Sequence, residues 1–241
     1  MLPTECVREE YLDASGASPF GVWFRSLDAV AAARVTVALT RIALGSTSNI
    51  KGVGEGVLEY RLDTGPGYRI YFGRDGTRLV ILVGGGTKRR QDQDIAAARA
   101  RWTDYIFVDR AFGPKTGSHF SERAPGAEKG ADERLASMTL TRSFKATVQA
   151  RVAADPAFGR ALLTEGVAAL LEGDVATGKA VLRDFINATL GFEALSAATG
   201  TPVKSLMRMF GPRGNPNAGN LFAVIGCLQR ASGVTLEVRA A

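Results

Sequence analysis

The pattern of apolar positions over residues 1–112 predicts a helical hairpin followed by an antiparallel sheet. Apolar side chains recur at helical spacing between residues 19 and 43, where Asp28 can cap the second of two helices. Alternating or continuous apolar runs, separated by Gly-containing turns, then predict consecutive strands. The expected elements are a strand at 7–12, the hairpin at 19–43, strands at 56–62, 67–72 and 79–83, and a last helix that begins at Asp92 or Gln93. We therefore expect an α+β fold with helices packed on the sheet.

The pattern after residue 137 is almost entirely helical. Residues typical of helix N-caps precede several apolar-periodic segments, and glycines follow others. The expected N-caps are Asp155, Asp174, Thr201 and Asn217, and the expected stops are Gly191 and Gly200. The expected helices cover residues 144–152, 155–172, 174–190, 192–200, 202–210 and 218–229. An all-α segment after an α+β segment favours two domains.

A change in composition separates these two segments. Residues 113–137 are rich in Gly, Pro, Ser and charged residues and lack apolar periodicity. Unstructured loops of that length are uncommon within compact domains, so we interpret the stretch as a linker. The alternative is a long surface loop of a single domain. The sequence thus predicts domains at 1–112 and 138–241, joined by the linker 113–137.

Composition narrows the class of protein. Of the 241 residues, 46% are hydrophobic, and the formal net charge is +6, which is compatible with a nucleic-acid partner. No stretch approaches the roughly 18 uncharged apolar residues of a membrane span, and no export signal is evident. The lone pair Cys6 and Cys227 suggests no disulfide framework, which favours a cytoplasmic location. One His and two Cys form no zinc cluster, so we expect neither a metal nor a cofactor.

Candidate chemistry in the first half lies on the predicted strands. Side chains alternate along a strand, so Arg61 on one strand and Arg69 with Tyr71 on the next would share a face if the strands pair. Lys51 precedes the sheet and Lys88 follows it. Arginine offers a planar fork to two phosphate oxygens, and lysine a point charge. Metal-free RNA cleavage needs a base, an acid and charge stabilisation, and these residue types can supply all three roles.

Simpler interpretations of the same region stay open. The basic face can be a solvated surface with ion pairs between strands, such as Glu59 with Arg69. The run from Gly84 to Lys88 is not a nucleotide-binding phosphate loop, because Arg89 stands where that motif needs Ser or Thr. We expect the three glycines of this run to end the third strand and to permit a sharp exit into the helix.

Residues 49–102 resemble the phage-derived, HigB-like killer proteins of the RelE/ParE toxin superfamily. The likeness rests on the order, spacing and turns of several runs, which are Lys51–Arg61, Gly65–Phe72, Leu82–Lys88, Gln91 and Asp94–Ile95. The resemblance implies growth inhibition, commonly by cleavage of mRNA on the ribosome. By matching position it implies an active surface of Arg61, Arg69 and Lys88, with Lys51 and Tyr71 next. Thr87 stands where the family usually has an acidic residue.

Residues 192–210 predict two short helices joined at a glycine turn. On the second helix, apolar side chains at i, i+3, i+4 and i+7 are expected to face the core; these are Val203, Leu206, Met207 and Phe210. Lys204, Ser205 and Arg208 are then left outward. A DNA-reading helix-turn-helix requires this arrangement, with Arg208 at a base edge and Lys204 and Arg213 at phosphates. An ordinary helical corner with a solvated face is the alternative.

Residues 140–238 resemble the HigA-like addiction-module antidote proteins. The matching runs include Leu182–Ala188, Phe192–Leu195, Lys204–Met209 and Gly214–Asn217. Asn215, in the last run, joins Lys204, Ser205, Arg208 and Arg213 as an expected DNA-binding residue. That family's partner is the killer protein that the first half resembles.

The two resemblances together imply a type II toxin–antitoxin module in one chain. We expect a metal-independent endoribonuclease acting on ribosome-bound mRNA, held inactive by an antitoxin half that binds operator DNA as an autorepressor. We hypothesise that the antitoxin half packs on the basic sheet face, within one chain or swapped between two, and that the chain forms a homodimer. Two alternatives stay open: a ParE-like gyrase inhibitor without catalysis, and a DNA-binding regulator with an inert toxin-like domain.

Overall fold

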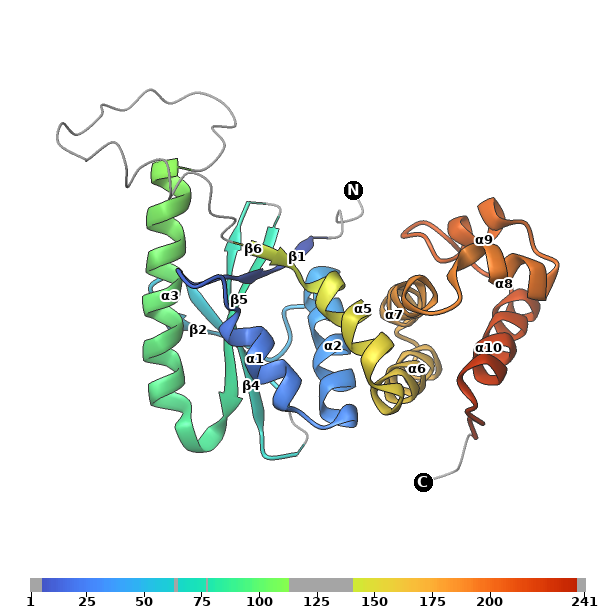
Figure 1. Ribbon diagram of the computed structural model, residues 1–241, viewed down its shortest axis with the longest axis horizontal. Coiled ribbons are helices and arrows are strands. Elements are labelled where there is room, and N and C mark those ends of the chain that lie inside the picture. The colour runs from blue at the N-terminus through green and yellow to red at the C-terminus, as the bar shows by residue number, and fades with distance from the viewer. Residues whose placement is uncertain (1–5, 63–64, 77, 113–140, 238–241) are drawn as a thin grey trace. The chain divides into compact units, whose positions relative to one another are not determined.

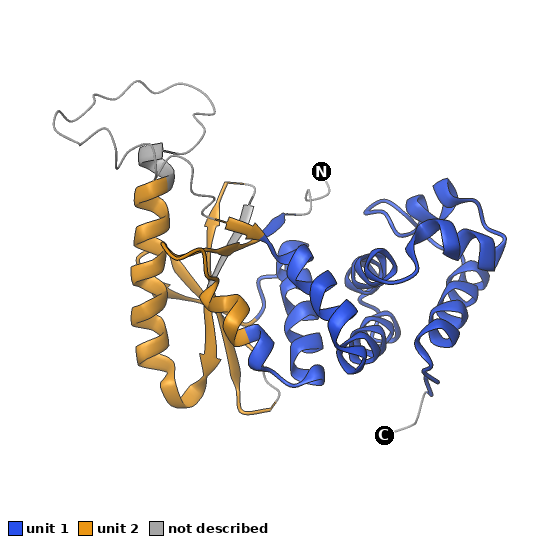
Figure 2. Ribbon diagram, in the orientation of Figure 1, with its two compact units in different colours: residues 1–8, 24–48, 143–241 blue, residues 9–23, 49–142 orange. Residues whose placement is uncertain are grey.

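The computed structural model describes residues 6–62, 65–76, 78–112 and 141–237 (Figure 1). The predicted linker 113–137 lies outside the described residues. The chain divides into two compact units (Figure 2). The sheet unit comprises residues 9–23 and 49–142, and the helical unit comprises residues 1–8, 24–48 and 143–241.

A six-stranded sheet with the strand order β2-β3-β4-β5-β1-β6 forms the sheet unit. The neighbours β2–β3, β3–β4 and β4–β5 pair antiparallel, which confirms the expected α+β class with an antiparallel sheet. Two strands, β2 and β6, were not predicted. The strands are β1 (Val7–Tyr11), β2 (Ile50–Gly54), β3 (Val57–Arg61), β4 (Tyr68–Asp75), β5 (Arg78–Thr87) and β6 (Thr141–Ser143).

Helices α1 (Pro19–Ser26) and α3 (Gln91–Phe112) lie against opposite faces of strand β5. A Cβ atom on Gly85 would lie 2.1 Å from the ring of Trp23 in α1. A Cβ atom on Gly86 would lie 2.0 Å from the carboxylate of Asp94 in α3. Since neighbouring residues of a strand point to opposite faces, each helix approaches one face closely. A short 3-10 helix, η1 (Lys88–Arg90), joins β5 to α3.

The expectation that Gly84, Gly85 and Gly86 end the strand is wrong. Strand β5 continues through all three to Thr87, and the residues pair with β4 along the way. These positions need glycine because space is limited there and not because the chain turns. A side chain at Gly85 or Gly86 would collide with the helix that covers it. Glycine inside this strand therefore marks the close approach of neighbouring side chains.

Seven helices of the described residues form the helical unit, and one of them comes from the first half of the chain. That helix, α2, packs against α6 and α7. Asp28, Asp155, Asp174 and Asn217 each accept a hydrogen bond from a backbone N–H of the helix that follows, which confirms these four N-caps. The helices are α2 (Ala29–Ala43), α5 (Phe144–Ala154), α6 (Pro156–Leu171), α7 (Val175–Ala188), α8 (Gly191–Thr199), α9 (Val203–Met209) and α10 (Ala218–Ser232).

Three details of the helical unit differ from the sequence expectations. Gly191, with φ 74°, begins α8 instead of ending α7. Pro202 rather than Thr201 occupies the N-cap position of α9, in an extended conformation that suits the restricted proline backbone. Met207 is 55% exposed, whereas Met209 is buried. The core face of α9 is therefore formed by Leu206, Met209 and Phe210, so that Met209 takes the inward place predicted for Met207.

The compact units do not coincide with the predicted domains 1–112 and 138–241. Helix α2 belongs to the unit that holds residues 143–241, and most of β6 belongs to the unit that holds the first half's sheet. The two halves of the sequence thus exchange elements in building the two units (Figure 2).

Candidate functional sites

Strand register brings four of the five predicted active-surface residues to one face of the sheet. Glu59 on β3 pairs with Lys51 on β2 and with Tyr71 on β4. Arg61 on β3 pairs with Arg69 on β4. Directly opposed residues of neighbouring strands project from the same face, so these side chains form two adjacent rows. The fifth predicted residue, Lys88, begins η1 just beyond the end of β5.

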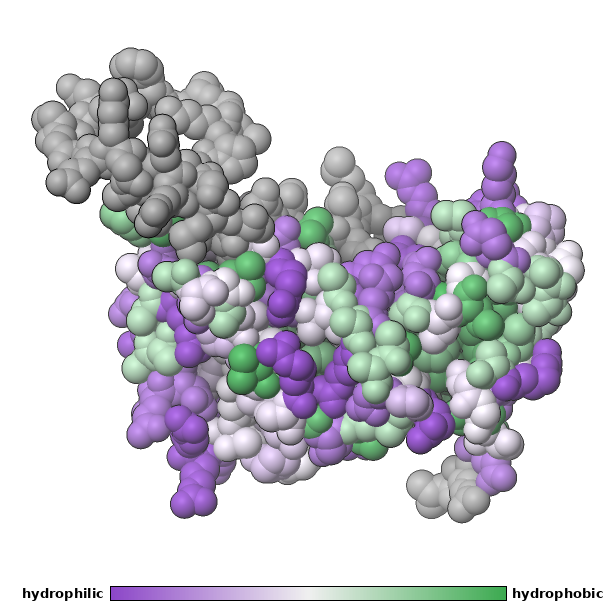
Figure 3. Space-filling model, viewed as in Figure 1, coloured by the Kyte–Doolittle hydropathy of each residue, from purple (hydrophilic) through white to green (hydrophobic). Residues whose placement is uncertain are grey.

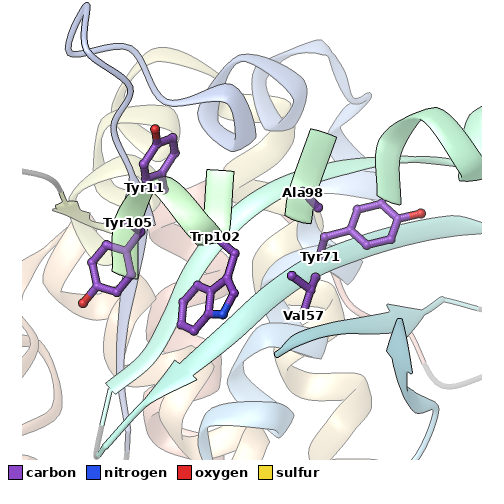
Figure 4. Close-up of a cluster of buried hydrophobic side chains, with 6 residues drawn as sticks. All are labelled: Tyr11, Val57, Tyr71, Ala98, Trp102 and Tyr105. Carbon is purple, nitrogen blue, oxygen red and sulfur yellow. The ribbon is translucent and has the colours of Figure 1, made fainter. Parts of the chain in front are cut away.

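Helix α3 covers part of that face and separates the predicted residues into two groups. It contacts β3, β4 and β5. Arg69 is only 6% exposed and Tyr71 is fully buried. The ring of Tyr71 lies beside Val57 of β3 and Ala98 of α3 in a buried cluster (Figure 4). The other three predicted residues, Lys51, Arg61 and Lys88, have exposed side chains.

A buried polar network holds Arg69. Its Nε lies 3.5 Å from a carboxylate oxygen of Glu59, and its Nη1 donates to the carbonyl of Gly67 at 3.0 Å. Gln91, the first residue of α3, donates to the other carboxylate oxygen of Glu59 at 2.8 Å. The expected ion pair between Glu59 and Arg69 is therefore present, but it is buried instead of lying on a solvated surface. Gln91 was not predicted as part of the network, although it follows η1 directly in sequence.

The buried surroundings of Tyr71 keep its hydroxyl protonated. Burial raises the pKa of Tyr71 well above its ordinary range, and the nearby carboxylates of Glu59 and Asp94 raise it further, while Arg69 opposes them. Burial likewise raises the pKa of Asp94, against the influence of Arg90 and Arg101. A phenol with so high a pKa can donate a hydrogen bond or a proton but is a poor base.

The accessible part of this face can bind anions, and the buried part cannot touch a substrate as it stands. Lys51, Arg61 and Lys88 offer cationic groups of the kind that contact phosphates. Arg69 and Tyr71 are enclosed between the sheet and α3. The alternation of side chains along the strands predicted correctly that these residues share a face of the sheet. It did not predict that a helix covers part of that face.

The second candidate site is built on two short helices of the helical unit. Helix α8 ends at Gly200, which has φ 69° and donates to the carbonyl of Ser196 at 2.9 Å. After Thr201 and Pro202, helix α9 begins at Val203, and buried Leu206 and Met209 hold it in place. The ring of Phe210, just past α9, lies 6.5 Å from that of Phe192 in α8. This packing fixes the angle between the two helices.

The outward face of α9 carries the predicted polar side chains. Lys204 and Arg208 are exposed, as the sequence predicted, whereas Ser205, which was also expected to face outward, is half-buried. Arg213 and Asn215, in the segment between α9 and α10, are also exposed. The five residues predicted to contact DNA are therefore all on the surface or at its edge. Their role as DNA contacts stays a prediction.

Buried Lys179 of α7 fixes the segment between α9 and α10. Its ammonium group donates to the carbonyl of Gly211 at 3.3 Å and to that of Gly214. A Cβ on Gly214 would lie 2.2 Å from the carbonyl oxygen of Met209, so only glycine fits there. Burial lowers the pKa of Lys179, and the charge of Arg183 lowers it further. The sequence analysis did not identify the role of Lys179, because a lysine within a helical pattern is usually a surface residue.

A pocket of about 350 Å³ lies where α9, this segment and the start of α10 meet. Four of the five predicted DNA-contacting residues line it, and the amides at the start of α10 add positive potential. Its lining residues are Thr201, Ser205, Arg208, Met209, Arg213, Gly214, Asn215, Pro216, Asn217 and Asn220. The pocket is thus positively charged and rich in hydrogen-bond donors, which suits a phosphate group.

Within the described ranges, no group of three or more His, Cys, Asp or Glu side chains is arranged to hold a metal ion. Among the helices of the described residues, none combines the length and apolar character that crossing a bilayer requires. On the visible face, hydrophilic and hydrophobic side chains are intermixed (Figure 3).

Comparison with known proteins gives one match. An uncharacterized protein of Haemophilus influenzae is 38% identical to this chain over 81 residues. The matched region covers 82% of that protein and 33% of this chain. No protein-family model matches the chain, and no solved structure matches it.

Proposed function

We propose that this chain, which belongs to the same family as the uncharacterized Haemophilus influenzae protein, is a toxin–antitoxin module in one polypeptide. In this proposal the second half contains a helix-turn-helix formed by α8 and α9 and binds operator DNA as an autorepressor. The first half is a RelE-like, metal-independent endoribonuclease for ribosome-bound mRNA, and the second half holds it inactive. No cofactor is required by this chemistry.

The observation that carries the proposal is the outward face of α9. Two short helices meet at a left-handed glycine, and the second presents Lys204 and Arg208 to solvent. A recognition helix needs this combination of a fixed interhelical turn and exposed side chains that can reach base edges. Arg208 has the fork that suits guanine, and Lys204 suits a phosphate.

The adjoining pocket supports the same function. Arg208 and Arg213 line it together with the start of α10. A helix N-terminus and two guanidinium groups favour an anion, and a DNA phosphate next to the recognition helix is the anion that this geometry fits. Such phosphate contacts would set the orientation of α9 in the major groove.

The first half supports a latent rather than an open ribonuclease. Lys51, Arg61 and Lys88 are exposed and carry the charge that contact with the phosphate backbone of RNA needs. Arg69 and Tyr71, which would complete the site, lie beneath α3. Catalysis would therefore require α3 to shift.

The burial of Arg69 and Tyr71 also favours a second candidate function. If α3 never shifts, the chain is a DNA-binding regulator whose toxin-like half is inert. Thr87 also favours an inert toxin-like half, because the family that the first half resembles usually has an acidic residue at this position. A third hypothesis is a toxin that inhibits gyrase without catalysis. In this hypothesis the exposed cations contact the gyrase protein.

Measurements of DNA binding test whether α9 is the recognition helix. We expect the full chain to bind the DNA that precedes its own coding sequence, and Lys204→Ala with Arg208→Ala to weaken binding about 10- to 100-fold. The salt dependence of the affinity should become less steep, because the variant releases fewer counterions. Fluorescence anisotropy over a salt series measures both.

Arg160→Ala is the matched control, since Arg160 is an exposed arginine on α6 of the same unit. It should bind DNA with nearly the affinity of the parent chain. If the double variant binds as tightly as this control, α9 is not the recognition helix and the proposal fails.

We also propose that the chain binds DNA as a homodimer. Two-fold symmetric operators need two recognition helices about one helical turn apart. Phe222 on α10 is 62% exposed and offers apolar surface for contact with a second copy.

A further inference from the structure

A second pocket of the helical unit has no part in the proposed function. It has a volume of about 250 Å³ and lies where α5, the first turns of α6, the end of α7 and the end of α10 meet. None of the described residues that line it also lines the pocket beside α9. It is therefore a separate candidate site within the same unit.

The wall of this pocket is mostly apolar. Phe185 of α7 and Val152 of α5 form its buried part, and Leu190, just past α7, forms an exposed part. Pro156 of α6 and Ala231 of α10 complete the apolar wall. Its volume of about 250 Å³ is below the roughly 300–1,000 Å³ of pockets that hold drug-sized ligands. The pocket thus fits a small apolar group, such as a phenyl ring or a short alkyl chain.

Gly159, inside α6, leaves space in this pocket that the fold does not require. A Cβ atom on Gly159 would lie 3.8 Å from Val152 and 3.9 Å from Phe185, which are ordinary contact distances. Gly166 of the same helix differs, because a Cβ atom there would lie 2.9 Å from Val181. Close packing of α6 on α7 therefore explains Gly166 but not Gly159. Since glycine weakens a helix relative to alanine, the space beside Gly159 suits a ligand rather than the protein's own packing.

Arg160 gives the pocket a positive charge. It lines the pocket and is exposed, and no carboxylate of the described residues pairs with its guanidinium. The closest carboxylates along the chain already have partners. That of Asp155 lies 3.7 Å from Arg151, and that of Glu165 lies 3.0 Å from Arg34. A guanidinium can bind a carboxylate through two parallel hydrogen bonds, so the pocket matches a molecule with an apolar body and one carboxylate.

We propose that this pocket binds a small monocarboxylate with an apolar body. The hydrocarbon part lies against Phe185 and Val152 in the space beside Gly159, and the carboxylate accepts hydrogen bonds from Arg160. The bound molecule bridges α6, α7 and α10, because all three helices line the pocket. This inference goes beyond the proposed function and does not depend on contact with DNA or RNA.

A ligand in this pocket ties the end of α10 to α6. Ala231 and Ser232, the last two residues of α10, line the pocket, and α10 also contacts α6 directly. At the other end of α10, Asn217 and Asn220 line the pocket beside α9, so this helix connects the two pockets. A ligand that binds only the folded arrangement stabilises it, so amides of the bridged helices should exchange more slowly with solvent when the pocket is occupied.

Binding of two probe carboxylates to the full chain tests the pocket. We expect phenylacetate and hexanoate to bind with Kd values of about 0.01–1 mM by isothermal titration calorimetry, and to raise the melting temperature. Phenylacetamide, which has nearly the shape of phenylacetate but no charge, should bind about three- to tenfold more weakly. Absence of binding by both carboxylates at about 10 mM would overturn the proposal.

Substitutions at Gly159 fill the pocket from the side of α6. Gly159→Leu should lower the affinity for phenylacetate at least about tenfold, because the new side chain takes the space of the ligand. Gly159→Ala is the matched control for folding. Its methyl group makes only ordinary contacts, so this variant should melt at or above the temperature of the parent chain. An affinity equal to that of the parent in folded Gly159→Leu would refute the proposal.

Arg160→Gln tests the charged contact while it leaves the apolar wall unchanged. The affinity for phenylacetate should fall to that for phenylacetamide, whose own affinity should not change. Arg25→Gln is the control, since Arg25 is an exposed arginine of the same unit that does not line the pocket. If Arg160→Gln still prefers phenylacetate, the proposal fails. Arg160 lies outside the surface proposed to contact DNA, so DNA affinity in the absence of a carboxylate should stay that of the parent chain.

Hydrogen exchange locates the bound probe. Phenylacetate at saturation should slow the exchange of amides at the start of α6 and at the ends of α7 and α10. Arg208 and Arg213 beside α9 are the competing cations of the helical unit that line a pocket. Protection confined to the segment between α9 and α10 would show that the carboxylate binds those arginines, and it would overturn the proposal.

Discussion

Single buried side chains decide what the sheet face can do. Arg69 and Tyr71 share a face with Arg61, as strand alternation predicts. The sequence does not say that α3 lies over two of them, because amphipathic periodicity gives a helix an inward face without naming the strand that it meets. The Gly84–Gly86 run does indicate that another element covers the sheet here, since glycine inside a strand marks the close approach of another element.

Asp94 is a residue whose charge opposes folding. It is the acid that approaches Gly86, and its Oδ2 is buried without a hydrogen-bond partner. Burial raises its pKa, so the folded protein holds this proton more tightly than the unfolded chain does. Stability therefore falls as pH rises through the range above the ordinary aspartate value, and the ionised carboxylate destabilises the neutral-pH protein.

We expect Asp94→Asn to raise the melting temperature at pH 7, and we expect the gain to shrink as pH falls toward about 4. Thermal unfolding followed by circular dichroism over a pH series measures this. Asp92→Asn, an exposed acid in the same first turn, controls for loss of a favourable charge at the helix start. A variant that is less stable than the parent at pH 7 would refute our account of this carboxylate.

At the scale of elements, long periodic segments were predictable and packing was not. The N-caps Asp28, Asp155, Asp174 and Asn217 fixed the starts of four helices correctly, because capping is a local interaction. The inward face of α9 was predicted correctly at Leu206 and Phe210 but wrongly at Met207, which is exposed while Met209 is buried. Short strands β2 and β6 gave no clear pattern and owe their existence to their neighbours in the sheet.

The segment between α9 and α10 is positioned by α7 through Lys179. We expect Lys179→Met, which keeps the length of the side chain, to leave the carbonyls of Gly211 and Gly214 without their donor and to lower stability by about 1–3 kcal/mol. The backbone amides of Gly211, Arg213, Gly214 and Asn215 should then exchange faster with solvent, and DNA affinity should fall.

Hydrogen exchange separates positioning from a general loss of stability. The positioning role requires faster exchange in the segment with little change in the amides of α6. Uniformly faster exchange across the helical unit, or DNA affinity equal to that of the parent chain, would show that Lys179 only supports the core.

At the scale of the whole molecule, two halves with different local patterns are interwoven. Composition separates residues 1–112 from 138–241, yet α2 and β6 each belong to the other half's unit. The sequence does contain a sign of this for α2, since a helix with so few polar positions cannot be a surface helix. If the first half is a toxin, this interweaving gives the second half direct contact with it, while Lys51, Arg61 and Lys88 are exposed.

The most direct test of the account is removal of the second half inside cells. A chain with a protease site within residues 113–140 and a degradation tag at its C-terminus is cut on induction, so that the second half is destroyed. We predict growth arrest with cleaved mRNA, and no arrest when Arg61→Ala and Lys88→Ala are present. Continued growth with intact mRNA, while the first-half piece accumulates, would contradict the proposal of a latent toxin, and arrest with intact mRNA and blocked DNA supercoiling would replace the ribonuclease with a gyrase inhibitor.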